Sequence, residues 1–238
     1  MGGGIAVGTH STLLSTNVYS WGQYVCPGLL CLLLAGTLMV ALGGQMKKTL
    51  RLKQWARHRN FAYTGEESEA FPPCEFFWER QSPRTYHRMT GDWHGQPVDL
   101  GYFVCETMRQ TGGGSPQRAT HWIPYLYLSE TPAGPGPVSI DPADGIPPRA
   151  RPIEGTRIEI GPPNFQAVFT VRAPSVEVAQ AVLTEARISL HLTRQDLAVH
   201  CAESGLLVLS RGERQCTPEQ FEKMLEFARK WLEKAAVH

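Results

Sequence analysis

The chain has 238 residues, of which 42% are hydrophobic and 19% are charged, and its formal net charge is +1. This composition excludes an intrinsically disordered chain, because it holds enough apolar material for a packed core. All 22 acidic residues but only 17 of the 23 basic residues lie in residues 60–238, so this part carries −5 and predicts no nucleic-acid partner.

The first predicted element is a transmembrane helix over residues 25–46. Residues 25–44 hold no charged side chain and are dominated by leucine. At a rise of 1.5 Å per residue, about 20 residues cross the roughly 30 Å hydrocarbon core of a bilayer. A buried core helix is one alternative, and a cleaved signal peptide is another, although no A-x-A site follows the apolar run. Translation from Met46 would give a chain without this segment.

Aromatic and basic residues flank the predicted helix. The N-terminal tail, residues 1–24, ends in three aromatic residues typical of a membrane interface, namely Tyr19, Trp21 and Tyr24. Residues 47–60 predict a juxtamembrane helix whose basic side chains contact anionic head groups. These side chains are Lys47, Lys48, Arg51, Lys53, Arg57 and Arg59. Basic flanks stay in the cytoplasm, so we expect a single-pass cell-membrane protein with its N-terminus outside and its C-terminal domain cytoplasmic.

A β-rich half follows over residues 61–130. Extended runs on both sides of the turn at His94 predict a hairpin within residues 84–108, and residues 120–129 predict the next strand. Pro124 favours an edge position or a bulge for that strand, because proline cannot donate to the ladder. Together these runs indicate a meander of three antiparallel strands.

The rest of the chain predicts a proline-rich linker over residues 131–153 and an α+β half over residues 154–238. Alternation over 165–172 predicts a half-buried strand, and two short helices and a second hairpin follow. From Thr217, a capping-box sequence opens an amphipathic helix that should cover a sheet. The fold class is therefore α+β, with a single N-terminal transmembrane helix, antiparallel sheet elements and a covering C-terminal helix.

Two stretches of this last part resemble a known family. They are NFQAVFTVRAPSVEVAQAVLTEARISLHL, residues 164–192, and LAVHCAESGLLVLSRGE, residues 197–213. The chain resembles an uncharacterised, actinobacterial-type bacterial family of membrane-anchored proteins, in which a phenylalanine-centred strand precedes a helix with an A-x-x-V-L-T segment. Here residues 179–184 carry that segment, and GDWHGQPVDL, residues 91–100, resembles the family's hairpin. The resemblance covers about residues 54–235 and implies no known activity or catalytic residue.

No motif of a hydrolase, nucleotide-binding enzyme or zinc protease is present, and the cysteines lack zinc-finger spacing. We therefore expect no cofactor and no structural zinc. One hairpin and its neighbouring strand do hold candidate ligands for a divalent metal, which are His87, Asp92, His94 and His121. Scattered surface histidines are the alternative interpretation, because two of these residues are seven positions apart and need not share a face.

Two further groups of residues have side chains of catalytic types. His200 and Cys201 are adjacent in a predicted strand, so their side chains should point to opposite faces and cannot form a simple dyad. Asp141 and Asp144 lie in the predicted linker, where no rigid scaffold would position them for acid–base chemistry.

The sequence supports two functional hypotheses. The favoured one is a membrane-anchored cytoplasmic interaction or accessory domain, which contacts the lipid bilayer and a protein partner. Partner contact would use the linker or a strand edge at residues 122–124. The alternative is an enzyme or ligand-binding protein with a site in the 87–121 hairpin region, where Arg88 joins the four candidate metal ligands. Enzymatic activity is thus not favoured, but it stays open.

Overall fold

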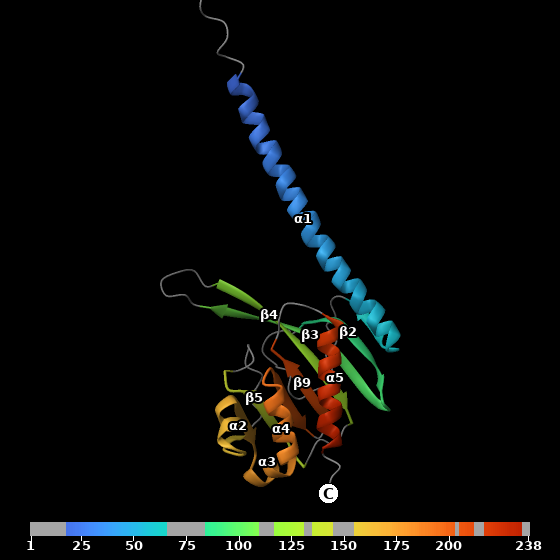
Figure 1. Cartoon of the computed structure of the whole chain (residues 1–238), viewed down its shortest axis with the longest axis vertical. Helices are drawn as coiled ribbons and strands as arrows, with labels where there is room; N and C mark the ends of the chain where they lie inside the picture. The colour runs from blue at the N-terminus through green and yellow to red at the C-terminus, as the bar shows by residue number, and fades with distance from the viewer. Residues whose placement is uncertain are drawn as a thin grey trace, which may run out of the picture. The chain divides into compact units, whose positions relative to one another are not determined.

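The computed structural model describes residues 18–65, 84–109, 117–130, 135–144, 155–202, 205–211 and 217–234. The chain divides into two units, Met1–Lys47 and Lys48–His238. The second unit is an α+β fold built on one large antiparallel sheet, with helices packed on one face of it (Figure 1). The predicted fold class is confirmed for this unit.

Nine strands form a single sheet in the order β1-β2-β3-β4-β9-β8-β5-β7-β6, and every neighbouring pair is antiparallel. The strands are β1 (Ala62–Gly65), β2 (Arg84–Trp93), β3 (Gln96–Arg109), β4 (Gln117–Ser129), β5 (Val138–Pro142), β6 (Thr156–Ile158), β7 (Phe169–Ala173), β8 (Leu197–Ala202) and β9 (Gly205–Ser210). The predicted three-strand meander is β2-β3-β4, and β4 continues directly into β9. The two predicted halves therefore share one sheet.

The predicted linker over residues 131–153 contains strand β5, which lies between β8 and β7. Val138 and Ile140 are fully buried, and Ser139 and Asp141 point to the other face. The structure differs from the expected linker because the prolines bracket this strand, while the four residues V-S-I-D keep the alternation that a strand needs.

Helices are α1 (Val18–His58), α2 (Pro163–Val168), α3 (Val176–Val182), α4 (Glu185–Thr193) and α5 (Pro218–Glu233). The predicted strand over 165–172 is wrong in its first half, because Pro163 occupies the first turn of α2 and β7 begins only at Phe169. Ser175 and Thr184 cap α3 and α4 by accepting the backbone N–H groups of Val178 and Arg187.

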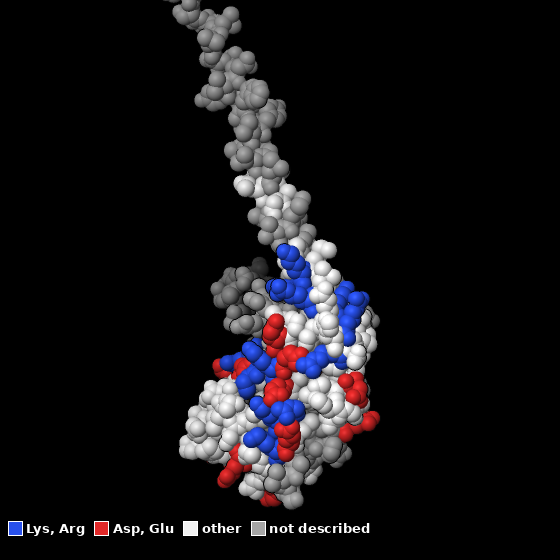
Figure 2. All heavy atoms as spheres, turned by 45° about the vertical axis from the view of Figure 1, so that its right-hand side comes forward, with Lys and Arg blue, Asp and Glu red and all other residues white. Residues whose placement is uncertain are grey.

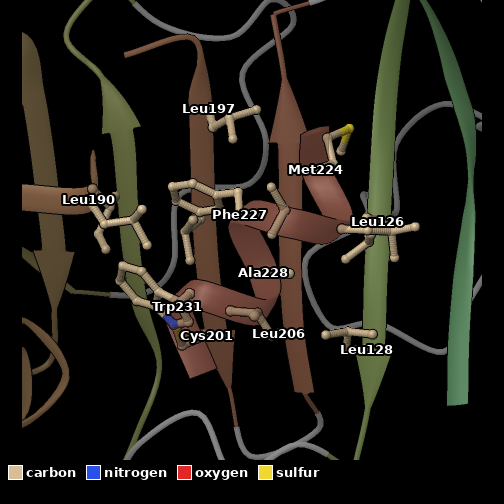
Figure 3. Packing of buried hydrophobic residues seen from close by; sticks show 14 of the residues in the cluster. Leu126, Leu128, Leu190, Leu197, Cys201, Leu206, Met224, Phe227, Ala228 and Trp231 are labelled. Carbon is tan, nitrogen blue, oxygen red and sulfur yellow. The ribbon is translucent and has the colours of Figure 1, made fainter. Parts of the chain in front are cut away.

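Helix α5 covers the sheet as predicted. Figure 3 shows Met224, Phe227, Ala228 and Trp231 facing the strands, within a core to which all five helices contribute. The predicted capping box does not form, since Thr217 occupies the N-cap position without a side-chain hydrogen bond. The Gln220 side chain instead donates to the Ser210 hydroxyl at 3.3 Å, which ties the start of α5 to β9.

A second apolar cluster lies on the opposite face of the sheet, and all of its members come from strands. They are Phe103, Ile123, Tyr125, Tyr127, Ala198, Ala202, Leu207 and Leu209. This cluster follows from register, because alternate residues of β3, β4, β8 and β9 point away from the helices. The sheet is therefore apolar at the centre of both faces.

Pro124 lies at an edge position of β4, as predicted. Strand β9 pairs with β4 only from Tyr125 to Ser129, so Pro124 stands where the β9 ladder ends and pairs with Tyr102 of β3 on its other side. From there outward, β3 and β4 continue as a two-stranded ribbon, in which Cys105 to Arg109 pair with Gln117 to His121. The missing N–H of proline is thus tolerated at an edge.

Helix α1 covers the predicted transmembrane and juxtamembrane segments. Among the residues that the structure describes, no helix combines the length and the apolar character needed to cross a membrane. Residues 1–17 of the predicted tail lie outside the described part of the chain. The membrane-spanning segment therefore stays a prediction.

Candidate functional site

The last turns of α1 are packed into the folded unit. Leu52 and Ala56 are fully buried in the main core. Trp55 stacks on Phe221 of α5, with ring centroids 5.8 Å apart and planes inclined by 19°, and meets the edge of Phe61 at the same distance. Burial of these apolar groups, more than helix propensity, holds this end of α1 on α5.

Glu222 of α5 ties the same contact together with polar bonds. Its carboxylate accepts the Trp55 indole N–H at 2.6 Å and the Arg59 Nε–H at 2.9 Å, and it also pairs with Arg59 Nη2. The two ion-pair side chains are 43% and 38% exposed. Solvent therefore screens the Arg59–Glu222 pair, and most of the holding energy comes from the Trp55 contacts.

This division predicts a small effect for Glu222→Gln. The variant keeps an acceptor for the Trp55 indole and removes only the charge of an exposed pair. We expect its free energy of unfolding to fall by less than about 1 kcal/mol. Urea unfolding of the wild type and variant at low and high salt measures this. A larger loss that salt does not reduce would show that the ion pair matters more than the aromatic contact.

The six predicted membrane-surface cations fall into two groups. The first group interacts with other parts of the folded unit. Arg59 forms an ion pair with Glu222, and Lys53 Nζ lies 5.2 Å from the centre of the Tyr63 ring. Arg51 interacts electrostatically with Glu219. The pKa of Glu219 is lowered chiefly by its own backbone N–H, with the charge of Arg51 adding to this. Figure 2 shows Lys and Arg side chains gathered around the last turns of α1.

The remaining cations are Lys47, Lys48 and Arg57. Lys48 and Arg57 form no ion pair within the described part of the chain. Lys47 and Arg57 are exposed, and Lys48 is half-buried. These three are therefore the cations most free to meet an anionic surface. The predicted interfacial aromatics Tyr19, Trp21 and Tyr24 belong to the first turns of α1, and their side chains lie outside the described residues.

The four predicted metal ligands are not brought together. His94 is exposed in the β2–β3 turn with φ of 55°, and Asp92 accepts the Gly95 N–H of the same turn at 2.8 Å. The His87 Nδ1 atom lies 2.6 Å from the Tyr63 hydroxyl, and His121 sits opposite Cys105 on β4. In the described ranges, no three His, Cys, Asp or Glu side chains are grouped as metal ligands would be.

Arg88 does belong to a polar cluster, which the sequence did not reveal. Its Nε and Nη2 atoms donate to Asp99 Oδ2 at 2.9 and 2.6 Å, and the Tyr125 hydroxyl donates to Asp99 Oδ1 at 2.9 Å. Burial raises the pKa of Asp99, and the bonds from Arg88 only partly oppose this. Burial likewise raises the pKa of Tyr125 well above its usual value.

A β-bulge in β2 places Arg88. The register with β3 shifts between Tyr86 and Met89, and His87 within this bulge has φ of 51°. A Cβ at Gly101 on β3 would lie 3.0 Å from the Tyr86 carbonyl oxygen, so a larger residue there would require the backbone of the bulge to shift. These hydrogen bonds join β2, β3 and β4, and among the described residues the cluster includes no group of metal ligands.

A second polar cluster joins β5 and β8. The His200 Nε2 atom lies 2.7 Å from Asp141 Oδ1, and His200 is 1% exposed. Burial acts to raise the pKa of Asp141, but the charge and hydrogen bond of His200 outweigh it and the net pKa is lowered. Sequence reasoning missed this pair because it placed Asp141 in a linker. The alternation of V-S-I-D was the one available signal.

Cys201, the neighbour of His200, points to the helix-covered face. It is fully buried, and burial raises the pKa of its thiol to about 12. In Figure 3 the indole nitrogen of Trp231 lies beside it. The two side chains thus occupy opposite faces of β8, and Cys201 is a core thiol.

The comparisons with known proteins concern the fold. No protein-family model matches the chain, and no curated protein matches it. A solved structure that is similar is described as the crystal structure of the mycobacterial trehalose monomycolate transport factor A, TtfA. The likeness has a TM-score of 0.50 at 16% sequence identity and covers 78% of this chain and 93% of that chain. At this identity the likeness shows a shared α+β fold.

Proposed function

We propose that this chain is a membrane-anchored accessory protein of a transport process, and that its folded unit works at the cytoplasmic membrane surface. One support is the fold shared with a protein named as a transport factor. The observation that carries the proposal is the docked end of α1. Buried Leu52 and Ala56 make this basic helix end a part of the fold.

The anchor in this proposal is residues 25–46, with residues 1–24 outside and residues 47–238 in the cytoplasm. The described side chains of this segment support it, since Leu30, Leu33 and Leu34 are 60%, 60% and 61% exposed. Leucine side chains in such positions are stabilised by transfer from water to hydrocarbon. Lys47, Lys48 and Arg57 then supply the positive charge that favours the cytoplasmic side and anionic head groups.

A protein partner is the second part of the proposal. In the described part of the sheet, β9 covers β4 only from Tyr125 to Ser129, so the stretch from Trp122 to Pro124 has no β9 neighbour. A strand edge that its own sheet leaves uncovered can accept an extended segment of another chain. This edge includes Trp122 and Pro124, where the sequence already indicated partner contact.

Topology is tested by reporter fusions to the full-length chain. A fluorescent protein fused after His238 should fold and emit, and alkaline phosphatase at the same place should be inactive, because the positive flank stays inside. Fusions placed before residue 1 should give the reverse result. An active phosphatase at the C-terminus would contradict the proposed orientation. Recovery of the whole chain in the soluble fraction would contradict the anchor.

The accessory role is tested by affinity purification of the tagged full-length chain from mild detergent. We expect a membrane transport component to be retained in a fixed ratio. A β4-edge variant, Thr120→Pro, removes a backbone N–H from the part of β4 that lies beyond its pairing with β9. Loss of the partner in this variant, with unfolding unchanged, would locate the contact. A partner-free full-length protein would contradict the accessory role.

A further inference from the structure

A row of polar residues crosses the sheet at its β6 end, on the face opposite the described helices. Arg157 of β6 is directly opposite Arg172 of β7, Arg172 is opposite Ser139 of β5, and Ser139 is opposite His200 of β8. Directly opposite residues of neighbouring antiparallel strands point to the same face. These four side chains therefore form one line across four strands.

The two arginines are the unusual part of this row. Directly opposite residues have Cβ atoms about 5 Å apart, and like charges in such pairs destabilise a sheet. Arg157 is exposed and Arg172 is half-buried. Neither arginine has a salt bridge within the described residues. No ion pair in the described residues therefore offsets the repulsion between the two guanidinium groups.

The acid of strand β5 is already engaged. Asp141 lies two residues beyond Ser139 on the same face of β5, and its carboxylate holds His200 at 2.7 Å. The charge of Arg172 reaches Asp141 only as a minor influence. Within strands β5, β6 and β7, two guanidinium groups thus share this face with one carboxylate.

Ser139 supplies an independent observation. Its residue is 1% exposed, and its hydroxyl has no hydrogen-bond partner within the described part of the protein. Ser139 faces the same side of β5 as Asp141 and helps to lower the pKa of that carboxyl. A buried hydroxyl without a partner costs free energy, and such groups usually mark a site for water, an ion or a ligand.

We propose that Arg157, Arg172 and Ser139 form a binding site for a phosphate group. Two guanidinium groups can donate several hydrogen bonds to one anion, and a phosphate monoester has enough oxygens and charge to accept them. A carboxylate ligand, in contrast, can be bound by the two parallel hydrogen bonds of a single arginine. The phosphate belongs to a lipid head group or to a soluble phosphate ester. The site is made of strand residues alone and does not depend on the membrane anchor or the transport role.

The experiment is a titration of the full-length protein in neutral detergent with inorganic phosphate, followed by thermal unfolding and calorimetry. Phosphate should raise the unfolding temperature, while chloride at the same ionic strength should not. Arg157→Gln and Arg172→Gln should each weaken phosphate binding by about tenfold, the size expected for loss of one charge-assisted contact. Ser139→Ala should weaken it less.

Ligand-free stability gives a second readout. Arg157→Gln should unfold at an equal or higher temperature than the wild type without phosphate, because it relieves like-charge repulsion. A merely structural arginine would lower that temperature. The matched control is Arg229→Gln on α5, whose guanidinium is bonded to Glu226 and Glu233 and should not affect phosphate binding.

Two further arms identify the source of the phosphate. Mixed micelles with phosphatidic acid should bind more tightly than glycerol 3-phosphate if the ligand is a lipid, and equally or less tightly if it is soluble. The proposal is overturned if the double variant Arg157→Gln, Arg172→Gln binds phosphate as the wild type does. It is also overturned if chloride reproduces the whole phosphate effect.

Discussion

Replacing the buried Arg187 of α4 by methionine is expected to destabilise the folded unit by about 2–4 kcal/mol. Arg187 is 2% exposed. Its Nη1 atom donates to the Val182 carbonyl at 2.7 Å and its Nε atom to the Trp231 carbonyl at 3.2 Å. Both carbonyls lie at or near the C-terminal ends of α3 and α5, where helices leave acceptors unpaired.

The two helix ends also explain why a charged guanidinium group is stable at this buried position. Burial lowers the pKa of Arg187, yet guanidinium remains charged at neutral pH. No carboxylate pairs with it in the described ranges. The negative ends of two helix dipoles face it instead. The Trp231 ring adds a cation–π contact, with Arg187 Cζ 4.5 Å from its centroid.

Arg187→Lys separates charge from geometry. Lysine keeps the positive charge but is a single point that cannot reach both carbonyls as a fork does. We expect the free energy of unfolding of Arg187→Lys, measured with urea, to lie between those of the wild type and Arg187→Met. If methionine were as stable as arginine, the two carbonyl contacts would contribute nothing net. The exposed, ion-paired Arg229→Met is the matched control and should change stability little.

The large periodic elements were predictable from the sequence. Helix α5 follows from a 3.6-residue apolar repeat behind Pro218, and β2-β3-β4 follow from alternation around a turn. Pro124 marked the edge of β4 because proline lacks a donor. These signals are local, so a single sequence is enough to read them.

What could not be predicted depends on long-range pairing. Strand β5 lies in a proline-rich stretch, so its short alternation was not read as a strand. Its pairing with β7 and β8 makes it an internal strand of the sheet. The partner of Arg88 is Asp99 across a bulge, and the partner of Arg59 is Glu222, which is 163 residues away. The contacts of Arg51, Lys53 and Arg59 with α5 and β1 could not be predicted for the same reason.

Stability of the folded unit should fall as the pH drops below about 6.5, because of His191. His191 is fully buried. Its imidazole contacts four aromatic rings, with ring centroids 4.9 to 6.2 Å apart, and these belong to Phe165, Phe169, Phe227 and Trp231. Neither ring nitrogen has a hydrogen-bond partner within the described residues. Burial lowers its pKa to about 3, and the charge of Arg187 adds to this.

The sign follows from where the proton binds. Between the unfolded pKa of about 6.5 and the folded pKa of about 3, the unfolded chain takes up a proton that the folded chain refuses. The stability is thus complete above pH 6.5 and is lost as the pH falls, by up to about 1.4 kcal/mol per pH unit. The lowered pKa of Asp141 keeps that carboxyl ionised across this range.

His191→Leu should remove this pH dependence, since leucine has a similar volume and no proton to bind. At pH 7 the variant should also be at least as stable as the wild type, because two unpaired ring nitrogens leave the core. Urea unfolding at several pH values between 5 and 7.5 measures both effects. The control is His94→Gln in the exposed turn, which should keep the wild-type slope. An unchanged slope in His191→Leu would mean that another group carries the acid sensitivity.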